Sequence, residues 1–135
     1  MQFRTRKMIA ARDLNSNGSL FGGRVLDWID EEAFIYASCQ LESESIVTRT
    51  MSEINFIATG RQGDVIEIGM EAVDFGRTSV TLRCEVRNRR TKKTITAVDR
   101  IVFVLVDRDG RPTPHGKTEA MTEATTGLSA PSVAG

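Results

Sequence analysis

Two features of one expected helix could do chemistry together: the carboxylate of Asp30 and the glycine pair Gly22-Gly23. On a helical wheel Asp30 falls inside a broad apolar arc, with Leu26 and Phe34 one turn away on either side. Burying an unpaired carboxylate is unfavourable by several kcal/mol, so we expect Asp30 to serve a site, as a general base or as a nucleophile. The alternative is an acid that only caps or pairs within the core.

The glycine pair stands where this helix is expected to begin, near Phe21 or Gly22, with Ser19 as a possible cap. Backbone N–H groups at a helix start, aided by the helix dipole, can polarise a carbonyl group, and glycine allows that group to approach closely. Taken alone, the pair is better explained as a plain glycine turn. Its distance from Asp30 is what relates the glycine pair to a possible site.

The spacing of these groups predicts an oligomer. Gly22 and Asp30 are separated by about 12 Å at about 1.5 Å of rise per residue, too far for one helix to present both to a single carbonyl group. Two antiparallel helices at a dimer interface would bring the start of one beside the middle of the other and form two equivalent sites. Trp28 and Ile35 agree with this arrangement, because they lie away from the apolar arc, where a partner subunit would cover them.

Composition narrows the class of protein. The chain has 135 residues, 40% of them hydrophobic, which suits one domain with one core. Its 18 basic residues balance 18 acidic ones and are dispersed, so nucleic-acid binding is not expected. No run approaches a membrane span and no apolar run follows the charged N-terminus, so we expect no membrane partner and a cytoplasmic location. Cys39 and Cys84 have the pattern of ordinary buried thiols rather than of a disulfide or a metal site.

Most of the chain after the expected helix, and a short segment before it, has the hydrophobic pattern of β-strands. Period-two alternation and apolar runs predict them at residues 3–9, 46–57, 65–75, 78–88 and 94–106, with the helix ending near Cys39. The run 100–106 is apolar almost throughout and is expected to be a central strand covered on both faces. One long central helix must be wrapped by one antiparallel sheet of five to six strands, which is an α+β fold. The domain is expected at 1–116, and residues 117–135, rich in Ser, Thr, Ala and Gly, are expected to be disordered.

Several motifs occur in register with those of one known family. Residues 13–23, DLNSNGSLFGG, resemble its D-T-N-x-x-G-x-x-F-G-G motif, and Trp28-Ile29-Asp30-Glu31 resembles its W-[IM]-D-E motif. Further matches follow at Val47-Thr48, Asn55-Phe56, Gly63-Asp64-Val65 and Gly76-Arg77-Thr78-Ser79. On these residues the chain resembles the hotdog-fold acyl-CoA thioesterases, in particular the YciA-like group that includes cytosolic acyl-CoA hydrolases, over about residues 6–114. Departures from the family pattern occur at Leu14, Glu32, Phe34 and Ala58-Thr59.

The resemblance implies a hotdog fold and the hydrolysis of acyl-CoA to a free acid and CoA, with no metal and no cofactor. It also implies a homodimer, assembled further as a trimer of dimers, in which Asn15 and the Gly22-Gly23 region of one subunit face Asp30 of the other. The Asn15 amide would place the water or the carbonyl group; without the family, Asn15 is better explained as a turn-former in a polar loop. Thioester hydrolysis needs an activated water and hydrogen-bond donors that stabilise the oxyanion. Asp30 would activate the water, and the backbone N–H groups of the glycine pair would stabilise the oxyanion.

Substrate contacts are expected at Phe56 and at the turn Arg77-Thr78-Ser79, which could touch the pantetheine or the phosphates of CoA. A hairpin with a solvated arginine explains that turn equally well. The basic run at residues 89–93 suits a nucleotide phosphate only weakly, because such clusters are usually solvated turns. His115 is the sole histidine and stands beside Pro114 near the tail, which disfavours histidine-based dehydratases, zinc sites and Ser-His triads.

Two other functions are compatible with the sequence. A non-catalytic acyl-CoA-binding or sensing module could use the same fold, but such a module has no reason to hold an unpaired acid at Asp30. An acyl-carrier-protein thioesterase would share the chemistry and differ in its partner.

Overall fold

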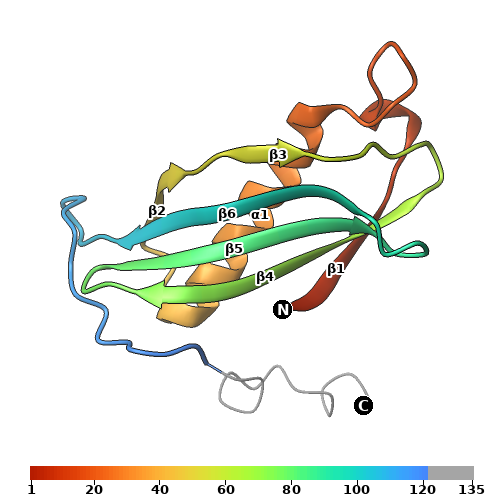
Figure 1. Ribbon diagram of the computed structural model, residues 1–135. Coiled ribbons are helices and arrows are strands. Elements are labelled where there is room, and N and C mark those ends of the chain that lie inside the picture. Colours follow the sequence, from red (N-terminus) through yellow and green to blue (C-terminus); the bar gives the residue numbers. More distant parts are fainter. Residues whose placement is uncertain (122–135) are drawn as a thin grey trace, which may run out of the picture.

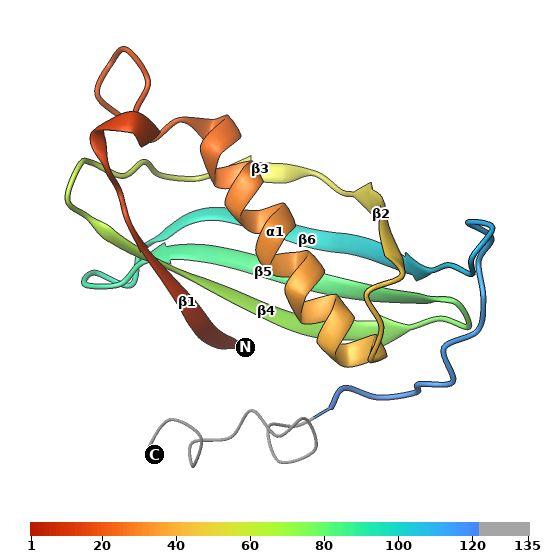
Figure 2. The same cartoon turned by 180° about the vertical axis from the view of Figure 1, so that it is seen from behind.

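The computed structural model describes residues 1–121, and their main feature is one long helix that lies against a single antiparallel sheet (Figures 1 and 2). The elements, in chain order, are β1 (Gln2–Met8), the 3-10 helix η1 (Ala11–Asp13), α1 (Gly22–Leu41), β2 (Ile46–Met51), β3 (Ile54–Phe56), β4 (Val65–Phe75), β5 (Ser79–Asn88) and β6 (Thr94–Leu105). The sheet has the strand order β1-β4-β5-β6-β2, and β3 also pairs with β6. This arrangement confirms the predicted α+β class, with a central helix and a six-stranded sheet.

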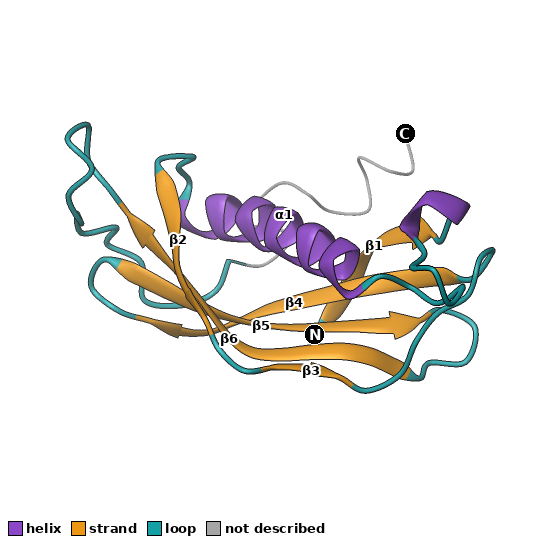
Figure 3. Ribbon diagram, turned by 90° about the horizontal axis from the view of Figure 1, so that it is seen from above, coloured by secondary structure: helices purple, strands orange, loops and turns teal. Residues whose placement is uncertain are grey.

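Helix α1 covers one face of the sheet, as the view from above shows (Figure 3). Its buried apolar stripe repeats every four residues, at Val25, Ile29, Ala33, Ala37 and Leu41. The helix ends at Leu41 because Glu42 takes a left-handed conformation with a φ of 52°. It begins at Gly22 with Phe21 as the N-cap, so the predicted Ser19 cap was wrong. Ser19 forms hydrogen bonds within the preceding loop instead.

The sheet confirms the alternation expected from the sequence. In β5 the residues that pack into the core with α1 are Val80, Leu82, Cys84 and Val86. In β6 the consecutive residues from Ile101 to Val104 are all buried, as expected of a strand that lies between β5 and β2. Phe34 of α1 packs edge-on against Phe103 of β6, with ring centroids 6.3 Å apart, and so joins the helix to the centre of the sheet.

The strand predicted at residues 46–57 is two strands rather than one. β2 and β3 both pair with β6, but the chain leaves the ladder at Ser52 and Glu53 between them. Ser52 bridges the break, since its N–H donates to the Arg100 carbonyl at 2.8 Å and its Oγ accepts the Arg100 N–H at 3.0 Å. Hydrophobic alternation does not reveal such a break, because it carries no information about the register of the partner strand.

After β6 the chain continues past the end of the sheet to the C-terminal end of α1. There Lys117 forms an ion pair with Glu42, and the Met121 N–H donates to Gln40 Oε1 at 2.7 Å. Of the tail predicted to be disordered, residues 122–135 lie outside the described part of the chain. The domain boundary at residue 116 therefore stays a prediction. Within residues 1–121 no helix is long and apolar enough to cross a membrane.

Candidate active site

The loop before α1 is held by a buried carboxylate that the sequence reasoning did not single out, Asp13. This residue is only 4% exposed; its Oδ2 accepts the Ala10 N–H at 2.8 Å, and its Oδ1 lies 3.2 Å from Arg24 Nε. Its carbonyl oxygen accepts the Phe21 N–H at 2.8 Å, so Asp13 fixes the residue that precedes the helix. The signal available in the sequence was its place as the first residue of the motif at 13–23.

Asn15 organises the same loop. Its Oδ1 accepts hydrogen bonds from the Asn17 N–H at 2.9 Å, from the Ser19 N–H at 3.2 Å and from Ser19 Oγ at 3.3 Å. Within one chain Asn15 is therefore a turn-former, the explanation that its residue type alone favours. Because the oxygen is occupied within the loop, any contact with a ligand would have to come from the Nδ2 hydrogens.

The start of α1 presents backbone donors between two aromatic rings. Phe21, the N-cap, has no side-chain acceptor, so the N–H groups of Gly22 and Gly23 receive no side-chain cap, whereas the Arg24 N–H donates to the Phe21 carbonyl at 3.0 Å. Phe21 and Phe56 are each 54% exposed. A methyl group on Gly22 would lie 3.3 Å from Phe56 Cε1, and one on Gly23 would lie 3.0 Å from Phe21 Cε2, so glycine allows both rings to lie close to the helix start. The structure thus brings Asn15, Gly22, Gly23 and Phe56 to one end of the helix.

Asp30 is exposed in the single chain, which corrects the expectation that it is buried among core residues. Its Oδ1 accepts a hydrogen bond from Thr48 Oγ1 of β2 at 3.2 Å. The buried stripe of α1 faces the sheet, whereas Asp30 lies on the flank of that stripe, next to the edge strand β2. Residue type could not separate the stripe from its flank, because Leu26 and Phe34 beside Asp30 are apolar but only half-buried.

The outer face of α1 leaves apolar surface uncovered in the single chain. Ile35 is 49% exposed, as expected of a residue that a partner subunit would cover. Trp28 is half-buried rather than exposed, because it packs against the edge of the core, and Lys7 Nζ lies 5.9 Å from its ring centroid. A shallow surface pocket beside Trp28 reaches Asp30 and is lined mostly by charged side chains.

The turn Arg77-Thr78-Ser79 lies at the other end of the sheet, beside the C-terminal end of α1 (Figure 1). It joins β4 to β5, and Arg77 is exposed. One chain therefore has the glycine pair at the start of α1, Asp30 near its middle and this turn near its far end. The predicted residues do not form one site within one chain. A second copy with an antiparallel helix would bring the start of its own α1 toward Asp30.

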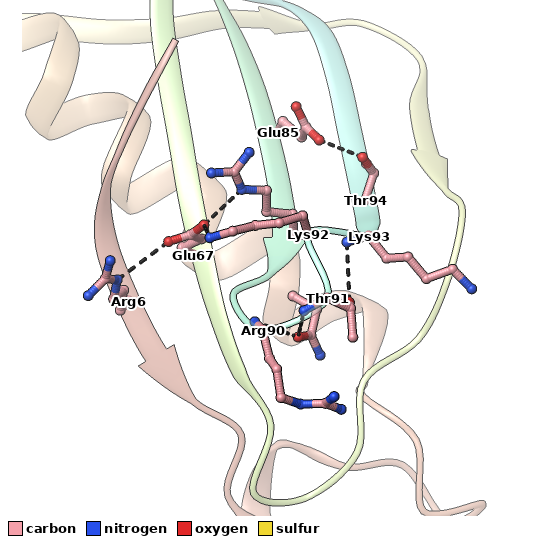
Figure 4. A network of polar contacts seen from close by, with 10 residues as sticks. Arg6, Glu67, Glu85, Arg90, Thr91, Lys92, Lys93 and Thr94 are labelled. Carbon is pink, nitrogen blue, oxygen red and sulfur yellow. Dashed lines mark hydrogen bonds and ion pairs between the residues drawn. The ribbon is translucent and has the colours of Figure 1, made fainter.

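The basic run at residues 89–93 belongs to the β5–β6 hairpin and takes part in an ion network (Figure 4). Lys92 Nζ lies 3.2 Å from Glu67, a carboxylate that is 2% exposed and that also lies 2.8 Å from Arg87 Nε and 3.4 Å from Arg6 Nε. Burial alone would raise the pKa of Glu67, but hydrogen bonds and charges from Arg87 and Lys92 outweigh burial and hold the pKa below its usual range. This network accounts for Lys92 without a ligand.

Cys84 does not have the surroundings of a nucleophile. Burial, and then the charges of Glu85 and Glu32, raise the pKa of the Cys84 thiol to about 12, so it stays protonated at neutral pH. Cys39 is a free, half-buried thiol. Among residues 1–121 no group of three or more His, Cys, Asp or Glu side chains is arranged to hold a metal ion.

Comparison with known proteins identifies the family. The model of the Thioesterase superfamily matches residues 17–95, more than half of the chain. The chain belongs to this superfamily. The matched stretch of this thioesterase-superfamily chain contains the glycine pair, Asp30 and the turn at residues 77–79.

Relatives extend this assignment across most of the chain. A protein of Buchnera aphidicola named as an uncharacterized acyl-CoA thioester hydrolase is 30% identical over 118 residues, covering 83% of this chain and 85% of the relative. The acyl-CoA thioester hydrolase YciA of Salmonella typhimurium is 27% identical over 115 residues, covering 81% of this chain and 86% of the relative. A hexameric hotdog fold thioesterase of Campylobacter jejuni superposes with a TM-score of 0.73 at 26% identity, covering 95% of this chain and 96% of that chain. The family resemblance and the hotdog fold are thus confirmed.

Proposed function

We propose that this protein is an acyl-CoA thioesterase, which hydrolyses acyl-CoA to a free acid and CoA at a site shared between two subunits. The observation that carries the proposal is the separation of the required groups along α1. Uncapped backbone donors stand at Gly22, and an exposed carboxylate stands at Asp30, about 12 Å along the helix. The relatives support the reaction, since those of Buchnera aphidicola and Salmonella typhimurium carry the name acyl-CoA thioester hydrolase.

Asp30 is proposed to attack the thioester, either through a water for which it is the general base or directly as the nucleophile. The hydrogen bond from Thr48 to Asp30 Oδ1 orients the carboxylate and leaves Oδ2 to face the substrate or its water. The N–H groups of Gly22 and Gly23 of the other subunit would hold the oxyanion, and the dipole of α1 would add to their effect.

The other predicted residues would bind the substrate. Asn15 Nδ2 would donate to the water or to the carbonyl group, and the exposed ring of Phe56 would line the path of the acyl chain. The turn Arg77-Thr78-Ser79 would contact CoA, with the guanidinium group on a phosphate. Arg77 forms no ion pair within residues 1–121, which supports this role because its charge is available to a ligand.

The proposed assembly is a homodimer with two equivalent composite sites, assembled further into a hexamer as a trimer of dimers. The open sheet edge at β2 and, separately, the exposed Ile35 on the outer face of α1 both support contact with a second subunit. The similar thioesterase of Campylobacter jejuni is hexameric. The proposed chemistry uses protein groups and water and gives no part to a metal or cofactor. The cytoplasmic location stays a prediction.

The test is the release of free thiol from a panel of short-chain, long-chain and aromatic acyl-CoAs by wild type, Asp30→Asn and Asp27→Asn. Asp27 is the matched control, because it lies one turn earlier on α1 and pairs only loosely with Arg24, at 3.8 Å. We expect Asp30→Asn to lose about a hundredfold or more in kcat and Asp27→Asn to stay within about twofold of wild type. Undiminished turnover by a folded Asp30→Asn protein would remove Asp30 from the mechanism.

The same assay addresses the two alternative functions. Binding of acyl-CoA by wild type without release of thiol would replace the proposal with a non-catalytic binding module, which the hydrolase names of the relatives do not favour. Faster turnover of the same acyl group on an acyl carrier protein than on CoA would make the carrier protein the substrate.

A further inference from the structure

The turn between β4 and β5 is fixed through its backbone. All three of its carbonyl oxygens accept hydrogen bonds: Arg77 from the His115 N–H at 3.3 Å, Thr78 from the Leu105 N–H at 2.8 Å, and Ser79 from the Gly76 N–H at 3.0 Å and from the His115 ring at 2.8 Å. His115 thus supplies two of these bonds, from outside the hairpin. A turn with its carbonyls occupied in this way has little freedom to change conformation.

Both ring nitrogens of His115 are in use, which fixes the tautomer. Nδ1 accepts the Lys117 N–H at 2.9 Å, so the ring proton lies on Nε2, which donates to the Ser79 carbonyl. The ring also meets Phe75 edge-on, with ring centroids 6.0 Å apart. One side chain therefore ties the C-terminal segment to the end of β4 and to the start of β5.

The segment that carries His115 is itself anchored on both sides. Before it, the Thr113 N–H donates to the end of β6 at 2.9 Å. After it, the buried side chain of Gln40 holds Met121, with Oε1 2.7 Å from the Met121 nitrogen, whereas the ion pair of Lys117 with Glu42 is open to solvent and adds little. His115 is thus held in place independently of the turn that it contacts.

We propose that His115 is a positioning residue, which holds the Arg77-Thr78-Ser79 turn in the conformation that binds CoA. The inference rests on the proposed function, in which Arg77 contacts a phosphate of CoA. Arg77 is exposed while its backbone is fixed by His115, so the guanidinium group is presented from a rigid base. A group on a rigid base loses less freedom on binding than one on a mobile loop. Loss of His115 should therefore weaken CoA binding and leave the chemistry at Asp30 unchanged.

The test compares His115→Ala, His115→Gln, Arg77→Ala and the control Lys117→Ala, each in the full chain. Glutamine keeps a side-chain N–H that can reach the Ser79 carbonyl, whereas alanine keeps only the backbone bond to Arg77. Lys117→Ala removes the ion pair with Glu42 but leaves every hydrogen bond to the turn in place. KM and kcat are measured for the best acyl-CoA, the Kd for CoA alone by calorimetry, and the unfolding midpoint for each variant.

We expect KM and Kd to rise about tenfold in Arg77→Ala and about three- to tenfold in His115→Ala, with kcat within about twofold of wild type. His115→Gln should recover most of the loss, and Lys117→Ala should behave as wild type. If His115→Ala does not fold, His115→Phe takes its place, because it keeps an aromatic ring against Phe75 but has no ring N–H for the Ser79 carbonyl. A rise in KM and Kd in His115→Phe then supports the proposal, and unchanged values overturn it.

Unchanged KM and Kd in His115→Ala, or equal rises in Lys117→Ala, would overturn the positioning role. An unaffected Arg77→Ala would also overturn it, because the turn would then not bind CoA, although loss of turnover in Asp30→Asn would still support the thioesterase. If wild type shows no turnover, the proposed reaction fails. The Kd values of wild type and His115→Ala for CoA alone then decide whether His115 positions the turn.

Discussion

Replacement of Glu67 by glutamine tests how the protein keeps a charge buried. Glu67→Gln keeps the shape of the side chain and removes its charge. Of its three cationic partners, only Arg87 makes a short contact, at 2.8 Å, while the side chains of Arg6 and Lys92 are 61% and 57% exposed. Solvent screens those two, so the loss corresponds to about one charge-assisted hydrogen bond. We expect the free energy of unfolding at pH 7 to fall by about 2 kcal/mol.

This loss should depend on pH in a definite direction. The pKa of Glu67 in the folded state is lower than its ordinary value, so the folded protein keeps the carboxylate ionised at a pH where the unfolded chain takes up a proton. The stabilisation is complete above the ordinary pKa of glutamate and is lost as the pH falls through the lowered folded pKa. Wild type and Glu67→Gln should therefore differ most near neutral pH and converge as the pH falls below roughly 4.

Urea unfolding at pH 7 and at several acidic pH values, followed by circular dichroism, measures both effects. The matched control is Glu71→Gln, which removes a carboxylate four residues along the same strand that is 28% exposed and pairs with Arg83. Its expected loss is below about 0.5 kcal/mol at any pH, because solvent screens the pair. A difference between wild type and Glu67→Gln that persists or grows in acid would refute the reasoning, as would an equal loss in Glu71→Gln.

Two further predictions concern the interface and the core. Ile35→Asp places a charge on the exposed outer face of α1 and should reduce the oligomer to a smaller species with little activity. Light scattering measures the mass and thiol release measures the activity. An unchanged mass would mean that this face is not the interface. Brief treatment with iodoacetamide at mildly alkaline pH should label Cys39 well before Cys84, because burial raises the pKa of the Cys84 thiol to about 12. Peptide mass spectrometry measures the labelling of each cysteine. Equal labelling would contradict the buried environment of Cys84.

Short-range patterns in the sequence were enough to predict most of the fold. The alternation from Val80 to Val86 reports which way each side chain points from its own backbone, and the structure confirms it. The apolar run at 100–106 predicts burial on both faces, which the structure shows for Ile101 to Val104. The helix expected from residue 21 or 22 to about residue 39 is α1, Gly22–Leu41. The motifs around Asp30 and the glycine pair identified the family because their residues stand in register along the chain.

The tertiary structure alone decided what lies opposite each side chain. The flank of α1 that carries Asp30 would be buried only beneath another strand or subunit, and the sheet ends at β2, so Asp30 is exposed in one chain. The burial of Asp13 and Glu67 and the hydrogen bonds of His115 to the turn depend on the positions of other segments. Periodicity fixes the direction of a side chain relative to its own helix or strand, whereas its partners depend on how distant parts of the chain pack.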